Sequence, residues 1–154
     1  MSKKSPGRAP SDPISAGRRW QNEAVAGYTS KNLREVENSA PKFGLAPGLE
    51  ARFASGALEL ERSGLSYQRL APGFRIPFGH RHAQQEEIYL IASGGGQMKL
   101  DDEIVELRQW DAVRVSAETT RNFEAGPEGA ELIVFGAPGP NATDAEMLPD
   151  WWSE

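Results

Sequence analysis

The chain has 154 residues, a net charge of −5 and no cysteine. This length suffices for one domain with its own hydrophobic core, and the lack of cysteine excludes disulfides, thiolate metal sites and thiol nucleophiles. No apolar run has the length of a signal peptide or a membrane span, which predicts a cytoplasmic protein without a membrane partner.

Residues 1–20 form a basic leader whose composition differs from that of the remaining chain. They carry five basic side chains against one acidic residue, Asp12, so the leader has a charge of +4 and the rest has −9. An acidic body argues against nucleic acid as the main partner. The leader is also rich in Ser, Pro and Gly, which predicts a disordered tail, with a weak contact to an anionic surface as the alternative.

Residues 21–63 are predicted to wrap around the main domain. Two prolines divide this region into short pieces. Leu49 and Phe53 are spaced i, i+4, which predicts a short helix over residues 49–54 that ends at Gly56. This helix would cover apolar surface of the main domain.

Residues 64–136 change to the two-residue period of β-strands, with many β-branched and aromatic side chains. The predicted strands cover residues 65–70, 76–82, 87–91, 97–100, 104–107, 112–115, 122–125 and 131–135. The turn signals between them are Pro72-Gly73, Gly94-Gly95-Gly96, Asp101-Asp102 and Gly126-Pro127. Many short strands without intervening helices indicate an all-β antiparallel barrel or sandwich, and successive hairpins around a central pocket indicate a jelly roll.

Both histidines of the protein lie in one predicted strand. His80 and His82 are two residues apart, so their side chains share one face of the strand. If that face is the inside of a barrel, a turn at residues 83–85 brings Glu87 on the next strand to the same place. Two imidazoles and a carboxylate form a site suited to Mn, Fe, Ni or Zn. The alternative is that both histidines are ordinary strand residues.

The stretch at residues 73–94 resembles the first motif of the cupin superfamily, a pattern of Gly, HxH, Glu and Gly. His80 and His82 match the HxH element, and Glu87 follows after four residues. Glu86 is the alternative acidic residue, but only Glu87 leaves six residues before the closing glycine. The resemblance implies an all-β fold, the cupin double-stranded β-helix or jelly-roll barrel, here with a short N-terminal helical wrap.

The second cupin motif, a pattern of Gly, PxG, His and Asn, matches residues 110–121 in spacing but not in chemistry. Arg121 stands where cupins carry their fourth ligand, a histidine. A guanidinium cannot ligate a metal and repels a divalent cation. We therefore expect a metal-free or weakly metallated pocket, in which Arg121 pairs with Glu87 or attracts an anionic ligand. The alternative is that Arg121 points outward to a surface carboxylate.

Strand alternation places further side chains inside the barrel, beside the two histidines and Glu87. Each lies two residues from a candidate site residue on its own strand, and they are Phe78, Tyr89 and Phe123. A mostly apolar lumen with a few polar groups is typical of a small-ligand site. These three residues and Arg121 are the expected ligand contacts, and no residue is assigned a catalytic role.

Two functions of different classes are consistent with this pocket. The first is a cupin-like binding protein for a small anionic or sugar-like molecule. The second is a metal-dependent enzyme, by analogy an isomerase or a dioxygenase, in which the histidines and Glu87 hold the metal while Tyr89 or Arg121 orients the substrate. The resemblance does not choose between them, because one fold hosts unrelated reactions.

Residues 137–154 are predicted to be a tail that packs on the barrel or on a partner subunit. Trp151 and Trp152 are adjacent in this tail, and exposed apolar surface costs about 25 cal/mol per Å² in water. A recognition motif for another protein is the alternative. A jelly roll also leaves strand edges and an apolar outer face, which small cupins commonly cover by pairing two subunits, so we expect a homodimer.

Overall fold

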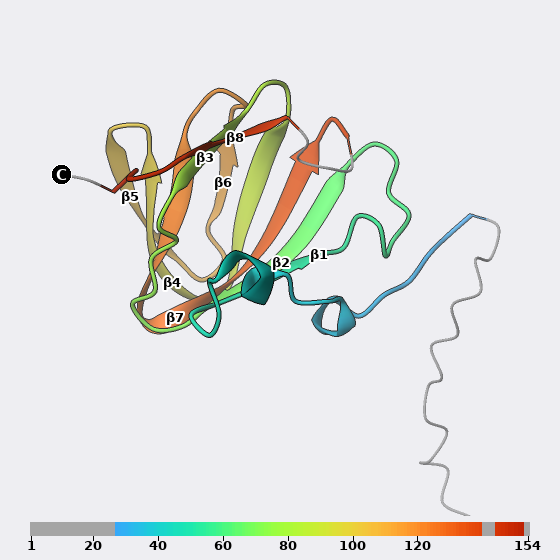
Figure 1. The fold of residues 1–154 in the computed structure, drawn as a ribbon, viewed down its shortest axis with the longest axis horizontal. Helices are drawn as coiled ribbons and strands as arrows, with labels where there is room; N and C mark the ends of the chain where they lie inside the picture. The colour runs from blue at the N-terminus through green and yellow to red at the C-terminus, as the bar shows by residue number, and fades with distance from the viewer. Residues whose placement is uncertain (1–26, 140–143, 153–154) are drawn as a thin grey trace, which may run out of the picture.

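The computed structural model describes residues 27–139 and 144–152, whose eight strands form one curled antiparallel sheet (Figure 1). The strands are β1 Leu49–Phe53, β2 Gly64–Leu70, β3 Gly79–His82, β4 Glu86–Leu100, β5 Glu103–Arg108, β6 Ala112–Val115, β7 Arg121–Ala137 and β8 Ala145–Leu148. Two 3-10 helices, η1 Leu33–Glu35 and η2 Ala40–Phe43, precede them. The expected all-β jelly-roll barrel is confirmed, whereas the predicted basic leader lies outside the described residues.

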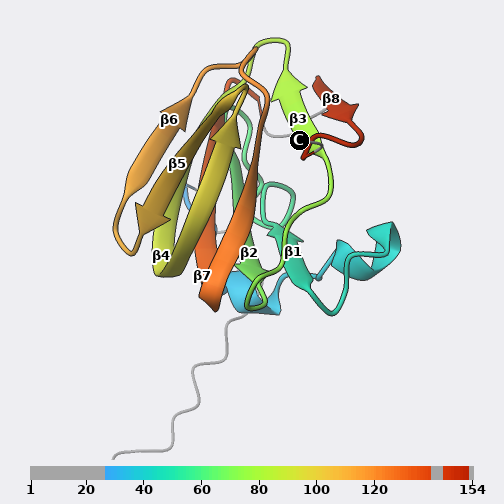
Figure 2. The ribbon, with the colours of Figure 1, turned by 90° about the vertical axis from the view of Figure 1, so that its left-hand side faces the viewer.

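The two long strands, β4 and β7, hold the barrel together because they pair with each other over most of their length. The first part of β4 also pairs with β6, and its last part pairs with β5. On the other side of β7 the order is β2 and then β1. Strand β3 joins β7 at a single pair, His80 opposite Arg121, and carries β8 on its other edge. Figure 2 shows β3 and β8 together on the opposite side from β5 and β6.

The hydrophobic core lies inside the curl of the sheet. Inward side chains recur at every second position of the strands, as a pleated sheet with one buried face requires. Among the most buried are Leu70, Ile91, Met98, Phe123 and Leu132. In the part of the chain that the structure describes, no helix is both long and apolar enough to cross a membrane.

The prediction of a short helix over residues 49–54 is wrong, because these residues form β1. Leu49 and Ala51 are both 5% exposed, which is the two-residue alternation of a strand, and all five residues of β1 pair with β2. Leu49 and Phe53 also share a face in a strand, so their i, i+4 spacing did not distinguish the two structures.

The glycine-rich segments predicted as turns are also different in the structure. Gly94-Gly95-Gly96 lies within β4, and Gly126-Pro127 lies within β7, so four predicted strands are two long ones. The pairing of β4 with β7 shifts register at this glycine run. Gly94 has φ +68°, and a Cβ atom there would lie 2.0 Å from the carbonyl oxygen of Gly129. The run therefore allows a bulge and a close approach of two backbones.

The strand that carries the histidines is shorter than predicted, since β3 begins only at Gly79. The C-terminal tail supplies β8, which pairs with all four residues of β3. Trp152 follows and donates its indole N–H to the carbonyl oxygen of Ile76 at 2.6 Å. Trp151 lies against Gly79, where a Cβ atom would come within 2.6 Å of the indole ring. The structure thus places both tryptophans on the segment that leads into and forms β3.

Candidate functional site

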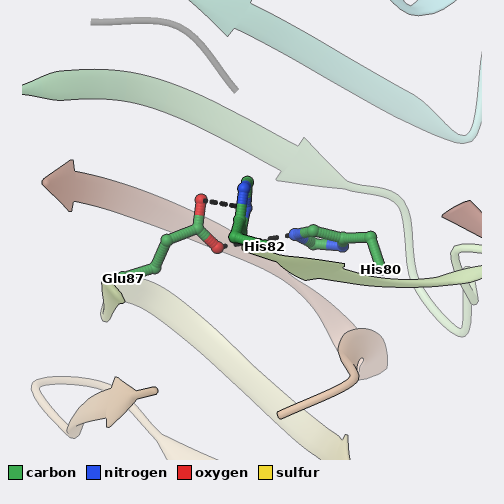
Figure 3. A group of neighbouring side chains, drawn as sticks. All are labelled: His80, His82 and Glu87. Atoms are coloured by element: carbon green, nitrogen blue, oxygen red, sulfur yellow. Dashed lines mark hydrogen bonds and ion pairs between the residues drawn. The ribbon is translucent and has the colours of Figure 1, made fainter. Parts of the chain in front are cut away.

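Strands β3 and β4 bring together three side chains that could hold a metal ion (Figure 3). His80 and His82 project from the same face of β3, and Glu87 comes from the start of β4. Nε2 of His80 lies 3.4 Å from Oε2 of Glu87, and Nε2 of His82 lies 3.3 Å from Oε1. The turn at residues 83–85 brings the two strands to this arrangement, as the spacing in the sequence predicts.

The Glu87 carboxylate is buried, and its two oxygens have different surroundings. Oε2 accepts hydrogen bonds from the Tyr89 hydroxyl at 2.5 Å and from Arg121 Nη2 at 3.0 Å, while Oε1 faces His82. Burial alone would raise the pKa of Glu87, but the adjacent imidazoles of His80 and His82 and the hydrogen bond from the Tyr89 hydroxyl hold it well below its usual value. Glu87 is therefore a carboxylate at neutral pH and can act as a metal ligand.

Glu86, the alternative to Glu87, lies on the outer face of the sheet. Its carboxylate is half exposed and accepts a hydrogen bond from Arg114 at 2.9 Å. Neighbouring residues of a strand point to opposite faces. Glu86 is thus absent from the cluster, although its chemistry is the same as that of Glu87.

His82 is held from behind by a residue of the C-terminal segment, Asp144. Nδ1 of His82 lies 3.0 Å from Oδ1 of Asp144. Its other ring nitrogen, Nε2, is buried and, within the described part of the chain, has no partner in hydrogen-bond geometry despite its distance of 3.3 Å from Glu87. Burial lowers the pKa of His82, but the carboxylates of Glu87 and Asp144 outweigh burial and raise it.

Arg121 is completely buried behind Glu87, and each of its three guanidinium nitrogens donates a hydrogen bond. Nε and Nη2 donate to Oε2 of Glu87 at 3.2 and 3.0 Å. Nη1 donates to the backbone carbonyls of Ser116, Ala117 and Thr119 at 3.4, 2.9 and 2.7 Å. Arg121 therefore fixes the carboxylate and the loop before β7, and it does not project into open space.

A cavity of about 250 Å³ adjoins the cluster. Its lining is mainly apolar, and it includes His80, His82, Glu87 and three of the expected ligand contacts, Phe78, Tyr89 and Phe123. Arg121, the fourth expected contact, is not part of the lining. Burial and the nearby charge of Glu87 raise the pKa of Tyr89 well above its usual value, so its hydroxyl keeps its proton and donates a hydrogen bond to Glu87.

The cluster could hold a metal ion, because one ligand atom from each of the three residues lies within 4.8 Å of the others. Donor atoms about 2.1 Å from a shared ion lie about 3.0–3.4 Å apart in octahedral or tetrahedral coordination, which is close to the distances from His80 to Oε2 and from His82 to Oε1 of Glu87. The unpartnered Nε2 of His82 is a donor atom of this kind. Three protein ligands leave further coordination positions for water or a bound molecule.

Sequence reasoning missed Asp144. It follows His82 by 62 residues and reaches it only because β8 pairs with β3. Its Oδ2 also accepts hydrogen bonds from the backbone N–H groups of Gln84 and Gln85 at 2.9 and 3.3 Å. Burial opposes ionisation, but these hydrogen bonds and the one from His82 lower the pKa of Asp144 to about 2. No local pattern around Asp144 signals this role.

Comparison with known sequences finds one short match and assigns no function. No family model matches the chain. An uncharacterized protein of Methanocaldococcus jannaschii is 31% identical over 70 residues, which are 45% of this chain and 56% of that protein. The match thus spans little more than half of the curated relative.

Solved structures share the fold at low sequence identity. A cupin protein from Bacteroides fragilis has a TM-score of 0.61 at 23% identity, over 74% of this chain and 86% of that one. Streptomyces Pac13, a nucleoside dehydratase solved with uridine, has a TM-score of 0.63 at 17% identity, over 82% and 92%. Oxalate decarboxylase of Bacillus subtilis has a TM-score of 0.67 at 20% identity, over 84% and 34%. These matches agree on one jelly-roll fold and not on one activity.

Proposed function

Because the chain has the fold of the cupin superfamily, we propose that it binds one divalent transition metal through His80, His82 and Glu87, together with a small ligand in the adjoining cavity. The observation that carries this proposal is the convergence of three donor atoms at the cavity wall, one of them the buried and unpartnered Nε2 of His82. Buried polar atoms are otherwise nearly always paired. Imidazole and carboxylate donors suit Mn, Fe, Ni or Zn.

The surroundings of Arg121 indicate that this residue holds the Glu87 carboxylate and does not bind the small ligand directly. Its charge is taken up by Glu87 and its remaining donors by backbone carbonyls, so Arg121 stabilises the ligand carboxylate from behind. It also adds positive charge close to the metal position, which favours weak binding and incomplete occupancy. The expected metal site is consequently weaker than one with four protein ligands.

The cavity favours a small molecule with one polar end. Its wall is mostly apolar and includes Phe78 and Phe123, with Ser66 and Gln68 of β2 among its polar groups. Within the described residues, no lysine or arginine lines it. An anionic or sugar-like ligand would therefore place a carboxylate or hydroxyl oxygen on the metal and its remaining part against the aromatic wall.

Metal titration of the purified protein tests this proposal. Calorimetry with Ni, Mn and Zn should show one site per chain in the wild type. Glu87→Gln should weaken binding by at least about tenfold, or about 1.4 kcal/mol, because the amide keeps the size of the side chain but loses its charge. Glu86→Gln is the matched control, since it removes the neighbouring carboxylate, which lies on the outer face.

Two results would contradict the proposed metal site. One is a wild-type protein that binds none of the three metals. The other is equal affinity in Glu87→Gln and Glu86→Gln, which would place the bound ion elsewhere.

A metal-dependent enzyme, an isomerase or a dioxygenase, is the second candidate function. The observation that favours it is the position of the Tyr89 hydroxyl, which lines the cavity and lies 3.4 Å from Nε2 of His80. A bound metal would supply Lewis acid chemistry, while Tyr89, protonated at neutral pH, would orient a substrate oxygen. Turnover that depends on Tyr89 would separate this candidate from simple binding.

The outer face of the sheet supports the proposed homodimer. Ile88 and Phe135 are paired residues of β4 and β7, and they are 42% and 45% exposed. The ion pair of Glu86 with Arg114 borders them, so a second copy could offer both an apolar patch and opposite charges. Light scattering should give the mass of a dimer for the wild type and of a monomer for Phe135→Glu. A monomeric wild type at tens of micromolar would refute the prediction.

A further inference from the structure

Asp144 connects the C-terminal segment to the proposed metal site. One carboxylate oxygen, Oδ1, lies 3.0 Å from Nδ1 of His82. The other, Oδ2, accepts hydrogen bonds from the backbone N–H groups of Gln84 and Gln85 at 2.9 and 3.3 Å. One side chain thus contacts both the second histidine and the turn that leads to Glu87.

The segment that carries Asp144 is firmly attached to the histidine strand. The residue after Asp144, Ala145, pairs with His82, and the rest of β8 pairs with the rest of β3. After β8, the chain is held by Lys99 of β4, which donates a hydrogen bond to the carbonyl oxygen of Trp151 at 2.8 Å. The Nζ atom of Lys99 also lies over the indole ring of Trp151, 4.6 Å from the ring centroid. These contacts hold Asp144 at a defined place behind the imidazole.

When it is neutral, the ring of His82 can donate a hydrogen bond to only one of its two carboxylate neighbours. A neutral imidazole carries a single N–H, and a carboxylate can only accept a hydrogen bond. With Asp144 facing Nδ1, the proton is on Nδ1, and Nε2 presents its lone pair. That lone pair faces Oε1 of Glu87 at 3.3 Å, so two acceptors meet in a buried place. A second proton on the ring or a metal ion between Nε2 and Oε1 would relieve this contact, so the pair is suited to a cation.

We propose that Asp144 is a positioning residue that selects the Nδ1–H tautomer of His82 and thereby directs the Nε2 lone pair at the metal. This inference rests on the proposed function and extends it to a residue of the C-terminal segment. Carboxylates that accept the second ring N–H of a metal-binding histidine orient the ring and raise its basicity, and their loss typically lowers metal affinity 10–100-fold.

The variant Asp144→Asn tests the tautomer directly. The amide has one acceptor oxygen, and the two backbone N–H groups of the turn compete for it. When that oxygen serves the turn, the NH₂ group faces His82 and favours the opposite tautomer, with the proton on Nε2. We expect metal affinity to fall about 10–100-fold by calorimetry with Ni or Zn. We also expect the ¹⁵N signals of His82 to show the tautomer change in the metal-free protein in alkaline buffer.

Glu146→Gln is the matched control. Glu146 lies two residues away on β8, and its carboxylate accepts a hydrogen bond at 2.7 Å from Arg81, an exposed residue of β3. This variant removes a carboxylate that joins the same two strands without contacting a histidine. Its metal affinity should stay within about twofold of the wild type, because an exposed ion pair contributes little to structure. Asp144→Ala provides a second variant that leaves Nδ1 without any side-chain partner.

The outcomes separate this inference from the proposed function. Wild-type affinity and an unchanged tautomer in both Asp144 variants would overturn the positioning role. An equal loss of affinity in Glu146→Gln would overturn it too, because the effect would then come from the pairing of β8 with β3. If the wild type binds no metal, the proposed function fails, and the ¹⁵N signals still decide whether Asp144 sets the tautomer of His82.

Discussion

Arg121→Met is expected to lower the free energy of unfolding by about 3–5 kcal/mol in the metal-free protein, because it removes one partner of a buried ion pair. The guanidinium is 0% exposed and makes two hydrogen bonds to the Glu87 carboxylate. The loss of the guanidinium leaves the Glu87 carboxylate without a permanent counter-charge. It also leaves the carbonyls of Ala117 and Thr119 without the donor that now satisfies them.

Arg114→Met is the control for this stability measurement. Arg114 pairs with Glu86 through an exposed contact on the outer face, and such pairs are worth about 0–1 kcal/mol. Denaturant unfolding in the presence of a chelator should therefore show a large loss of stability for Arg121→Met and a small one for Arg114→Met, although both substitutions are of the same chemical type. The double variant Glu87→Gln with Arg121→Met should be more stable than the Arg121 variant alone, since it leaves no unpaired charge. Equal stability of Arg121→Met and wild type would show that the buried pair does not stabilise the fold.

The strands were predictable where their signals are local. The alternation in residues 65–70 and 112–115 predicts β2 and β6 to within one residue of their observed ends. The prediction of a helix at Leu49 was wrong because an i, i+4 apolar pair fits a strand equally well. The strand that pairs with β1 is β2, which lies later in the chain than the few residues from which the helix was predicted.

The glycine runs show a second limit of local reasoning. Glycine favours turns, but it is also required where two backbones approach closely. The reason for Gly94 lies in the carbonyl of Gly129, which is 35 positions away in the chain and 2.0 Å from where a Cβ atom would be. Only the pairing of β4 with β7 brings the two together.

The candidate site also contains residues that local sequence patterns predict and residues that they do not. His80, His82 and Glu87 lie within eight residues of one another, so strand geometry alone predicts their convergence. Arg121 is inside the barrel, as alternation predicts, but it lies behind Glu87 because the carbonyls of the loop before β7 hold its Nη1. Asp144 is reached only through β8 and had no signal in the sequence.

Arg121→His is expected to raise metal affinity by at least about 3 kcal/mol, or a hundredfold, because it removes a buried positive charge and adds a fourth donor. Arg121 lies opposite His80 in the pairing of β7 with β3. Its Nε is 3.2 Å from Oε2 of Glu87, and an imidazole Nε2 extends about as far from its Cα as an arginine Nε does. The substituted ring can thus reach the other donors.

The gain in affinity should be accompanied by a loss of stability without metal. Imidazole cannot replace the hydrogen bonds from Nη1 to the loop carbonyls, so the metal-free variant should unfold more easily than the wild type and recover when metal binds. Calorimetry and denaturant unfolding with Ni, Mn and Zn measure both effects. Arg121→Met is the control, since it removes the same charge without adding an imidazole and so separates repulsion from ligation. Tight binding by the wild type that Arg121→His does not improve would show that Arg121 lies beyond the reach of the metal and does not weaken the site.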